Sequence, residues 1–143
     1  MSDTTVLLVD DEEEFLAALA ERLALRDLAV DTAATGAAAL AMAKRCTYDA
    51  ILLDMAMPGL DGLATLKALL AINADLQVIV LTGRATLAQA VEAMKSGALD
   101  LMEKPADIDA LVARIEEAAR RRSSLDDERV QRRIEEITRK MGW

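Results

Sequence analysis

Five short apolar runs, each followed by a segment whose apolar residues recur at helical spacing, constrain the fold of this chain more than any other feature. Most of the runs are apolar throughout rather than alternating, as expected for strands buried on both faces of a sheet. Regular alternation of strands and helices predicts a parallel sheet with helices on both sides. We therefore expect an α/β, doubly wound fold of five strand–helix units, with strands at about 6–9, 28–34, 50–53, 78–81 and 99–102.

The composition limits the chemistry that is available. The formal net charge of −8 argues against a direct nucleic-acid binder, because affinity for a phosphate backbone comes largely from Lys and Arg. The chain has no His, so it can have no His base, nucleophile or metal ligand. A metal site would consist of carboxylates and carbonyls, which suits Mg²⁺, Mn²⁺ or Ca²⁺.

The few aromatic residues and the single cysteine indicate what kind of core the chain forms and in which cellular compartment it works. Aromatic residues make up only 2% of the chain, so the core must be aliphatic, and Tyr48 is expected to pack with its hydroxyl in water. One cysteine, Cys46, excludes an internal disulfide and fits a reducing compartment. Neither a signal peptide nor an apolar run of transmembrane length is evident. We expect a cytoplasmic protein without membrane contact.

Polar residues follow four of the five apolar runs. Asp10 and Asp11 follow the first run, Asp54 the third, Thr82 the fourth and Lys104 the fifth. In doubly wound sheets the functional site lies outside the carboxyl ends of the strands. Three acids, a hydroxyl and an ammonium group should therefore converge at one edge of the sheet.

That group of residues predicts phosphoryl chemistry. Three close carboxylates repel one another by several kcal/mol even at an effective dielectric of about 20, and a divalent cation relieves the repulsion. Aspartate can act as a nucleophile that forms an aspartyl phosphate. Taken singly, the residues have blander interpretations: Asp11 with Glu14 matches a helix capping box, Thr82 a turn residue and Lys104 a surface residue. Together they favour a phosphoryl-accepting aspartate with its metal.

Four stretches of sequence carry a recognisable pattern: "LLVDDEEEF", "DAILLDMAMPGLDG", "VIVLTG" and "GALDLMEKP". In order and spacing they resemble the receiver domain of two-component response regulators, over about residues 4–122. The resemblance implies a flavodoxin-like strand order, 2-1-3-4-5. We assign residues 1–122 to this domain and residues 123–143 to a C-terminal helical extension.

The resemblance also implies roles at the reacting group. Asp54 would be the phosphoacceptor, phosphorylated by a sensor histidine kinase or a phosphotransfer protein. Thr82 and Lys104 would contact the phosphoryl group, and the Lys104–Pro105 peptide bond would be cis. The only reactions expected are self-phosphorylation from phosphodonors and slow autodephosphorylation, so the chain is not expected to be an enzyme in its own right.

The same resemblance implies a set of metal ligands. Asp11 and Asp54 would bind Mg²⁺, or Mn²⁺, directly, together with the backbone carbonyl of Ala56. Asp10 would hold a metal-bound water. This sequence departs from the family three residues before the lysine, where Leu101 replaces the usual Tyr or Phe. Signalling through that ring is therefore in question, and Arg84, two residues after Thr82, lies near the expected phosphoryl position.

The residues after the domain predict a separate sixth helix. Arg120–Arg122 are interpreted as the end of the fifth helix, and Ser124 with Asp127 matches a second capping box. The sixth helix would span Leu125–Met141. Within it a coiled-coil-like seam recurs at 4-3-4 spacing: Val130, Ile134, Ile137 and Met141.

The seam covers only about two heptads, and such short helices are marginal alone. It could pair with a second copy of the chain, dock back on its own domain or bind a partner helix. Three functions remain open: a phosphoryl-controlled switch of protein–protein interactions, a relay intermediate to a histidine phosphotransfer protein, and a receiver fragment of a longer transcription regulator. Residues 123–143 are too few for a second core, and neither a P-loop nor G-x-G-x-x-G is present.

Overall fold

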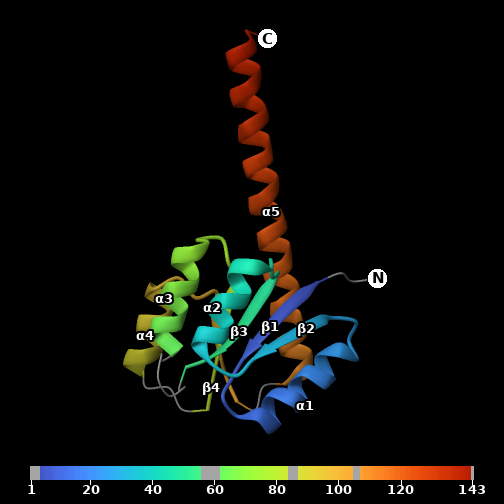
Figure 1. Ribbon diagram of the computed structural model, residues 1–143, viewed down its shortest axis with the longest axis vertical. Coiled ribbons are helices and arrows are strands. Elements are labelled where there is room, and N and C mark those ends of the chain that lie inside the picture. Colours follow the sequence, from blue (N-terminus) through green and yellow to red (C-terminus); the bar gives the residue numbers. More distant parts are fainter. Residues whose placement is uncertain (1–3, 56–61, 84–86, 105–106, 143) are drawn as a thin grey trace.

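Five parallel strands and five helices alternate along the chain (Figure 1). The computed structural model describes residues 4–55, 62–83, 87–104 and 107–142. The strands are β1 (Thr5–Val9), β2 (Ala29–Ala33), β3 (Ala50–Asp54), β4 (Val78–Thr82) and β5 (Asp100–Glu103). The helices are α1 (Glu13–Ala24), α2 (Gly36–Arg45), α3 (Gly62–Ile72), α4 (Leu87–Lys95) and α5 (Ile108–Met141).

The strands form one sheet in the order β2-β1-β3-β4-β5, and every neighbouring pair is parallel. This confirms the predicted fold class and strand order. The register places Val9 beside Leu53 and Asp54 beside Leu81. The first and third strands are therefore neighbours, and the residues that follow them meet at one edge.

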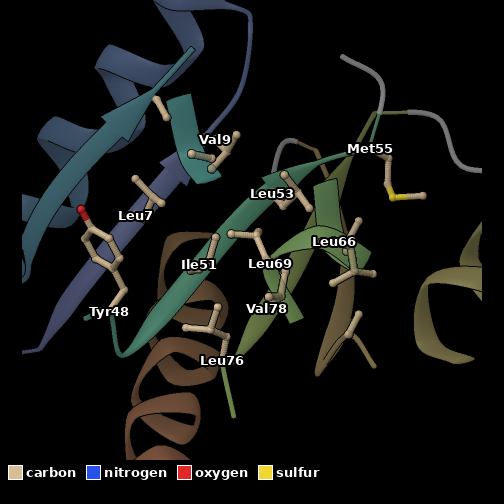
Figure 2. Packing of buried hydrophobic residues seen from close by; sticks show 14 of the residues in the cluster. Leu7, Val9, Tyr48, Ile51, Leu53, Met55, Leu66, Leu69, Leu76 and Val78 are labelled. Atoms are coloured by element: carbon tan, nitrogen blue, oxygen red, sulfur yellow. The ribbon is translucent and has the colours of Figure 1, made fainter. Parts of the chain in front are cut away.

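Successive side chains of each central strand enter different cores on the two faces of the sheet. Leu7, Ile51 and Val78 belong to one cluster, which α2, α3 and α4 cover. Figure 2 shows Leu66 and Leu69 of α3 packed among these strand residues. Leu8 and Leu52, among others, belong to the second cluster, which α1 and α5 cover. Burial on both faces explains why these strands are apolar throughout.

The hydroxyl of Tyr48 lies inside the structure and not in water. The side chain is buried in the first cluster (Figure 2). Its hydroxyl donates a hydrogen bond to Asp31 Oδ2 at 2.7 Å. Burial, followed by the neighbouring Asp31 carboxylate, raises the pKa of the Tyr48 phenol. The expectation of a wet hydroxyl is wrong because β2 provides a carboxylate within reach.

The predicted sixth helix does not exist as a separate element. Helix α5 runs without a break for 34 residues, about 50 Å, and its second half projects away from the sheet (Figure 1). Its N-cap is Asp107, whose side chain accepts a hydrogen bond from Ala110 N, and its C-cap is Gly142 at φ 74°. Ser124 is an interior residue of this helix and not an N-cap. The extra C-terminal helix is thus a continuation of α5.

Two arginine–aspartate pairs explain why the helix continues. Arg122 Nη1 lies 2.7 Å from Asp49 Oδ1, and Arg129 pairs with Asp75 in the loop before β4. These contacts attach the start of the extension to the end of the sheet opposite to Asp54. The interpretation of Arg120–Arg122 as a helix end is therefore also wrong. The domain boundary at 122 remains a prediction, since the helix crosses it.

The seam residues of the extension are exposed. The exposed fractions are 59% for Val130, 51% for Ile134, 48% for Ile137 and 58% for Met141. At 3.6 residues per turn, Val130 lies five full turns after the buried Val112, so the seam continues one side of the packed face of α5 into the part that projects beyond the sheet (Figure 1). The seam is therefore not docked on the described part of its own chain. No helix among the described residues is long and apolar enough to span a membrane.

Candidate functional site

Two neighbouring central strands bring the acidic residues together. Asp10 directly follows β1, and its backbone N–H donates to Ala33 O of β2 at 3.1 Å, so its position is fixed by the sheet. Asp54 is the last residue of β3. Because β1 and β3 are adjacent and parallel, their carboxyl ends meet. The predicted convergence of the strand ends is confirmed for these residues.

Asp10, Asp11 and Asp54 form one acidic cluster. Each offers a carboxylate oxygen, and the three oxygens lie within 4.8 Å of one another. Asp10 and Asp54 are only 3% and 4% exposed, whereas Asp11 is exposed. An all-oxygen set that opens to solvent on one side fits a hard divalent cation that keeps several waters. Ala56, the predicted backbone ligand, lies outside the described residues.

The carboxylate of Asp10 already has a partner on each oxygen. Its Oδ1 accepts a hydrogen bond from the backbone N–H of Glu12 at 2.9 Å. Its Oδ2 accepts one from Lys104 Nζ at 2.5 Å. These contacts compensate the buried charge of Asp10. They also leave Asp11, which is exposed, better placed than Asp10 for direct contact with a hydrated cation.

The ammonium group of Lys104 is the cation at the centre of the site. Besides Asp10, its Nζ lies 3.5 Å from Asp54 Oδ1 and 3.7 Å from Glu12 Oε1, and its side chain is only 11% exposed. Burial by itself lowers the pKa of Lys104, but the hydrogen bond to Asp10 and the surrounding carboxylates outweigh burial and raise it. The backbone N–H of Lys104 donates to Thr82 O at 2.8 Å, which ties β5 to the end of β4.

Sequence reasoning missed one residue of the site, Phe15. Lys104 Nζ lies 4.4 Å from the centroid of the Phe15 ring, in the first turn of α1. The pattern that revealed the other residues was a polar side chain at the end of a strand, and Phe15 does not fit it. No signal in the sequence pairs an aromatic residue at 15 with a lysine at 104.

Thr82 and Gly62 complete the described surroundings of Asp54. Thr82 is buried at the end of β4, one residue after Leu81, which pairs with Asp54. Gly62 begins α3 so close to the chain after Asp54 that a Cβ atom there would lie 2.3 Å from Met55 Cα. Any other residue at 62 would displace this segment.

The departure at Leu101 has a packing explanation. Leu101 is partly buried on β5 and packs against the core cluster that α2, α3 and α4 cover. It thus has an ordinary core contact in this structure. Two further sequence expectations, the position of Arg84 and the geometry of the Lys104–Pro105 bond, lie outside the described residues.

Comparisons with known proteins agree with this site. The family model for the response regulator receiver domain matches residues 6–116. The chain is 42% identical over 119 residues to the transcriptional regulatory protein PrrA of Mycobacterium tuberculosis, an alignment that covers 83% of this chain and 51% of PrrA. It is 37% identical over 123 residues to the transcriptional regulatory protein ZraR of Escherichia coli, which covers 86% of this chain and 28% of ZraR.

A solved structure is similar over nearly the whole chain. It is a response regulator protein from Burkholderia pseudomallei with a phosphorylated aspartic acid, a calcium ion and citrate. It is 30% identical to this chain, with a TM-score of 0.75, and the match covers 95% of this chain and 86% of that one. The chain thus spans about half of PrrA and about a quarter of ZraR, but most of this solved protein.

Proposed function

Because the chain belongs to the response regulator receiver domain family, we propose that it is a phosphoryl-controlled switch in which Asp54 accepts the phosphoryl group. The observation that carries the proposal is the juxtaposition of three carboxylates within 4.8 Å and a lysine ammonium 3.5 Å from one oxygen of Asp54. The similar Burkholderia protein, with its phosphorylated aspartic acid and calcium ion, supports it.

The chemistry assigned to each residue follows from its position. An oxygen of Asp54 attacks the phosphorus of the donor, the new O–P bond forms, and the bond to the leaving nitrogen or oxygen breaks with its electron pair. When the donor is the phosphohistidine of a sensor kinase, the leaving group would be the histidine nitrogen. Lys104 neutralises charge on the phosphoryl oxygens, and the Thr82 hydroxyl can donate a hydrogen bond to one of them.

A divalent cation belongs to the proposal, with Asp11 and Asp54 as direct ligands and Asp10 as the holder of a bound water. Mg²⁺ is the favoured ion and Mn²⁺ a possible substitute, because both prefer oxygen ligands. When bound, it would supply charge neutralisation at the phosphoryl oxygens. Both carboxylate oxygens of Asp10 already accept hydrogen bonds, which supports a role for Asp10 through a bound water and not as a direct metal ligand.

The partners are also proposals. We expect a sensor histidine kinase or a phosphotransfer protein as donor, and a second copy of the chain as a partner of the seam formed by Val130, Ile134, Ile137 and Met141. A direct contact with nucleic acid is not expected from a chain of net charge −8. A cytoplasmic location belongs to the same proposal, supported by the single cysteine.

A second candidate is the receiver part of a longer transcription regulator. PrrA and ZraR are transcriptional regulatory proteins, and this chain corresponds to only part of each. The uninterrupted α5, which projects beyond the sheet, is suited to connect a receiver to another domain (Figure 1). A relay role toward a histidine phosphotransfer protein uses the same Asp54 chemistry.

Incubation with acetyl phosphate and Mg²⁺, followed by intact-mass measurement, tests the proposal. The wild-type chain should gain one phosphoryl group, and Asp54→Asn should gain none. Asp27→Asn, at an exposed aspartate in the turn after α1, is the matched control and should be modified like the wild type, because asparagine suits its positive φ of 64°. Chelation of the metal should abolish the gain. A wild-type chain that gains no phosphoryl group from acetyl phosphate or from phosphoramidate would contradict the proposed function.

A further inference from the structure

The aromatic ring beside the lysine carries an inference that rests on the proposed function. We propose that Phe15 is a positioning residue for Lys104: the face of its ring holds the ammonium group beside Asp54, where the phosphoryl group is to arrive. Phe15 takes no part in the phosphoryl transfer itself. It acts only through Lys104.

The geometry of the contact is that of a cation–π interaction. Lys104 Nζ lies 4.4 Å from the ring centroid, within the range of about 6 Å over which the ring attracts a cation. The attraction is stronger when the cation is shielded from water, and the Lys104 side chain is 11% exposed. Figure 1 shows α1, which carries Phe15, beginning close to the end of β1, where the acidic cluster is.

Phe15 lies at the edge of the second core, where it lines a small hollow together with Leu81, Asp10 and Asp54. Among the residues that the structure describes, Phe15 belongs to neither of the two buried clusters, whereas Leu16, next to it on α1, is buried in the second. The side chain is partly exposed. The only phenylalanine of the chain therefore lies between the edge of the second core and the ammonium group of Lys104.

The carboxylates hold the ammonium group beside the acceptor through charge alone, so their hold changes when charge at the site changes. Asp10 draws Lys104 Nζ to 2.5 Å, which leaves it 3.5 Å from Asp54, and Glu12 is further away and mostly exposed. A divalent cation on the same acids weakens their pull on Lys104, because the two cations repel each other. The ring is neutral and its attraction does not depend on the charge state of the acids. It remains effective when the carboxylates are neutralised.

The experiment compares Phe15→Leu, which keeps an apolar side chain, with Phe15→Tyr, which keeps the ring face. With acetyl phosphate and saturating Mg²⁺, Phe15→Leu should be phosphorylated between about twofold and thirtyfold more slowly than the wild type, the range expected for a cation–π contact. Phe15→Tyr should stay within about twofold of the wild type. In a Lys104→Met background, Phe15→Leu should cause no further slowing.

A second measurement reports the contact itself. The protons on the Lys104 carbon next to Nζ should show an upfield ring-current shift in the NMR spectrum of the wild type and of Phe15→Tyr. The shift should vanish in Phe15→Leu, while urea unfolding shows that this variant remains folded.

Three results would overturn the inference: an unchanged rate in Phe15→Leu, equal slowing in Phe15→Leu and Phe15→Tyr, or slowing that persists without Lys104. A wild-type chain that is not phosphorylated at all would overturn the proposed function together with the inference. A wild type that is phosphorylated normally, with Phe15→Leu at the same rate, would overturn only the role of Phe15.

Discussion

At the scale of single residues, the site is a set of buried charges that compensate one another. Asp10 and Asp54 are almost completely buried, and Lys104 is the cation that contacts both. Removing Lys104 would leave two buried carboxylates without a cation, which is destabilising unless a metal ion neutralises them, whereas neutralising Asp54 leaves Lys104 paired with Asp10. Asp11 differs because it is exposed and its charge is solvated. It is therefore the acid that can be changed with least damage to the fold.

Asp11→Asn should weaken the response to Mg²⁺ while leaving the metal-free protein at least as stable as the wild type, because it removes one of three close negative charges. A ligand that binds only the folded state at about 100 times its Kd stabilises it by about 2.7 kcal/mol. If the substitution weakens binding by at least about tenfold, it removes about 1.4 kcal/mol of that gain. Thermal unfolding with and without Mg²⁺, at ionic strength matched with KCl, measures the difference.

Asp27→Asn is the control for a simple change of net charge, because Asp27 is exposed in the turn after α1 and outside the acidic cluster. It should show the full Mg²⁺ response. Equal Mg²⁺ responses in the wild type and in Asp11→Asn would contradict the assignment of Asp11 as a direct ligand.

At the scale of elements, the sequence pattern predicts a break near Ser124, but α5 runs through this position without interruption. Ser123 and Ser124 followed by acidic residues match an N-terminal capping pattern, which is a local signal. Serine, however, is only slightly unfavourable inside a helix, so a serine does not by itself end one. The Arg122–Asp126 pair at i, i+4 and the contacts of Arg122 and Arg129 with the sheet end favour continuation.

Leu125→Pro distinguishes a continuous helix from two helices. If Ser124 were an N-cap, proline at the next position would be tolerated. In the continuous helix it should cost about 3 kcal/mol or more, because it removes a hydrogen bond and clashes with the preceding turn. Circular dichroism at 222 nm and urea unfolding should both show the loss.

Leu125→Ala is the matched control for the Leu125→Pro experiment. It removes the same partly buried side chain and keeps a good helix former, so its loss of stability should be much smaller. Proline and alanine variants of equal helicity and stability would contradict an uninterrupted α5.

At the scale of the whole molecule, two cores hold a compact sheet from which one helix projects (Figure 1). The start of the extension is fixed to the domain by Arg122–Asp49 and Arg129–Asp75. The exposed seam begins only at Val130, immediately after the second of these pairs. The extension is therefore directed by the domain, and its apolar stripe is left for another molecule.

A second copy of the chain should bind this seam weakly. A stable interface buries roughly 1,200–2,000 Å², and two heptads bury much less. Association is therefore expected only at about micromolar concentrations or above. Analytical ultracentrifugation over a concentration series should show a dimer for the wild type. A double variant, Ile134→Lys with Ile137→Lys, should be monomeric.

Glu136→Lys changes the net charge as much as the double variant does, but on the side of the helix away from the seam, and it should associate like the wild type. A phosphorylated sample belongs in the series, because the proposed switch would change protein–protein contacts when Asp54 is phosphorylated. A wild-type chain that stays monomeric at every concentration, with and without phosphorylation, would contradict pairing with a second copy.

The sequence by itself determined the five strand–helix units and the edge of the sheet at which to look for the site. Both depend on local signals: apolar runs that end in polar residues, and helical spacing between them. Asp10, Asp11 and Asp54 could be found in this way because parallel strands necessarily bring their carboxyl ends together. The strand order came from the resemblance to a family and was confirmed by the structure.

Only the tertiary structure decided which groups touch. Lys104 pairs with Asp10 across 94 residues, Phe15 lies against the same ammonium group, and Arg129 reaches Asp75. These contacts depend on how two elements pack and on the rotamers of long side chains, which leave no periodic trace in a sequence. The continuity of α5 has the same cause, since contacts with the sheet end outweigh a weak local capping signal.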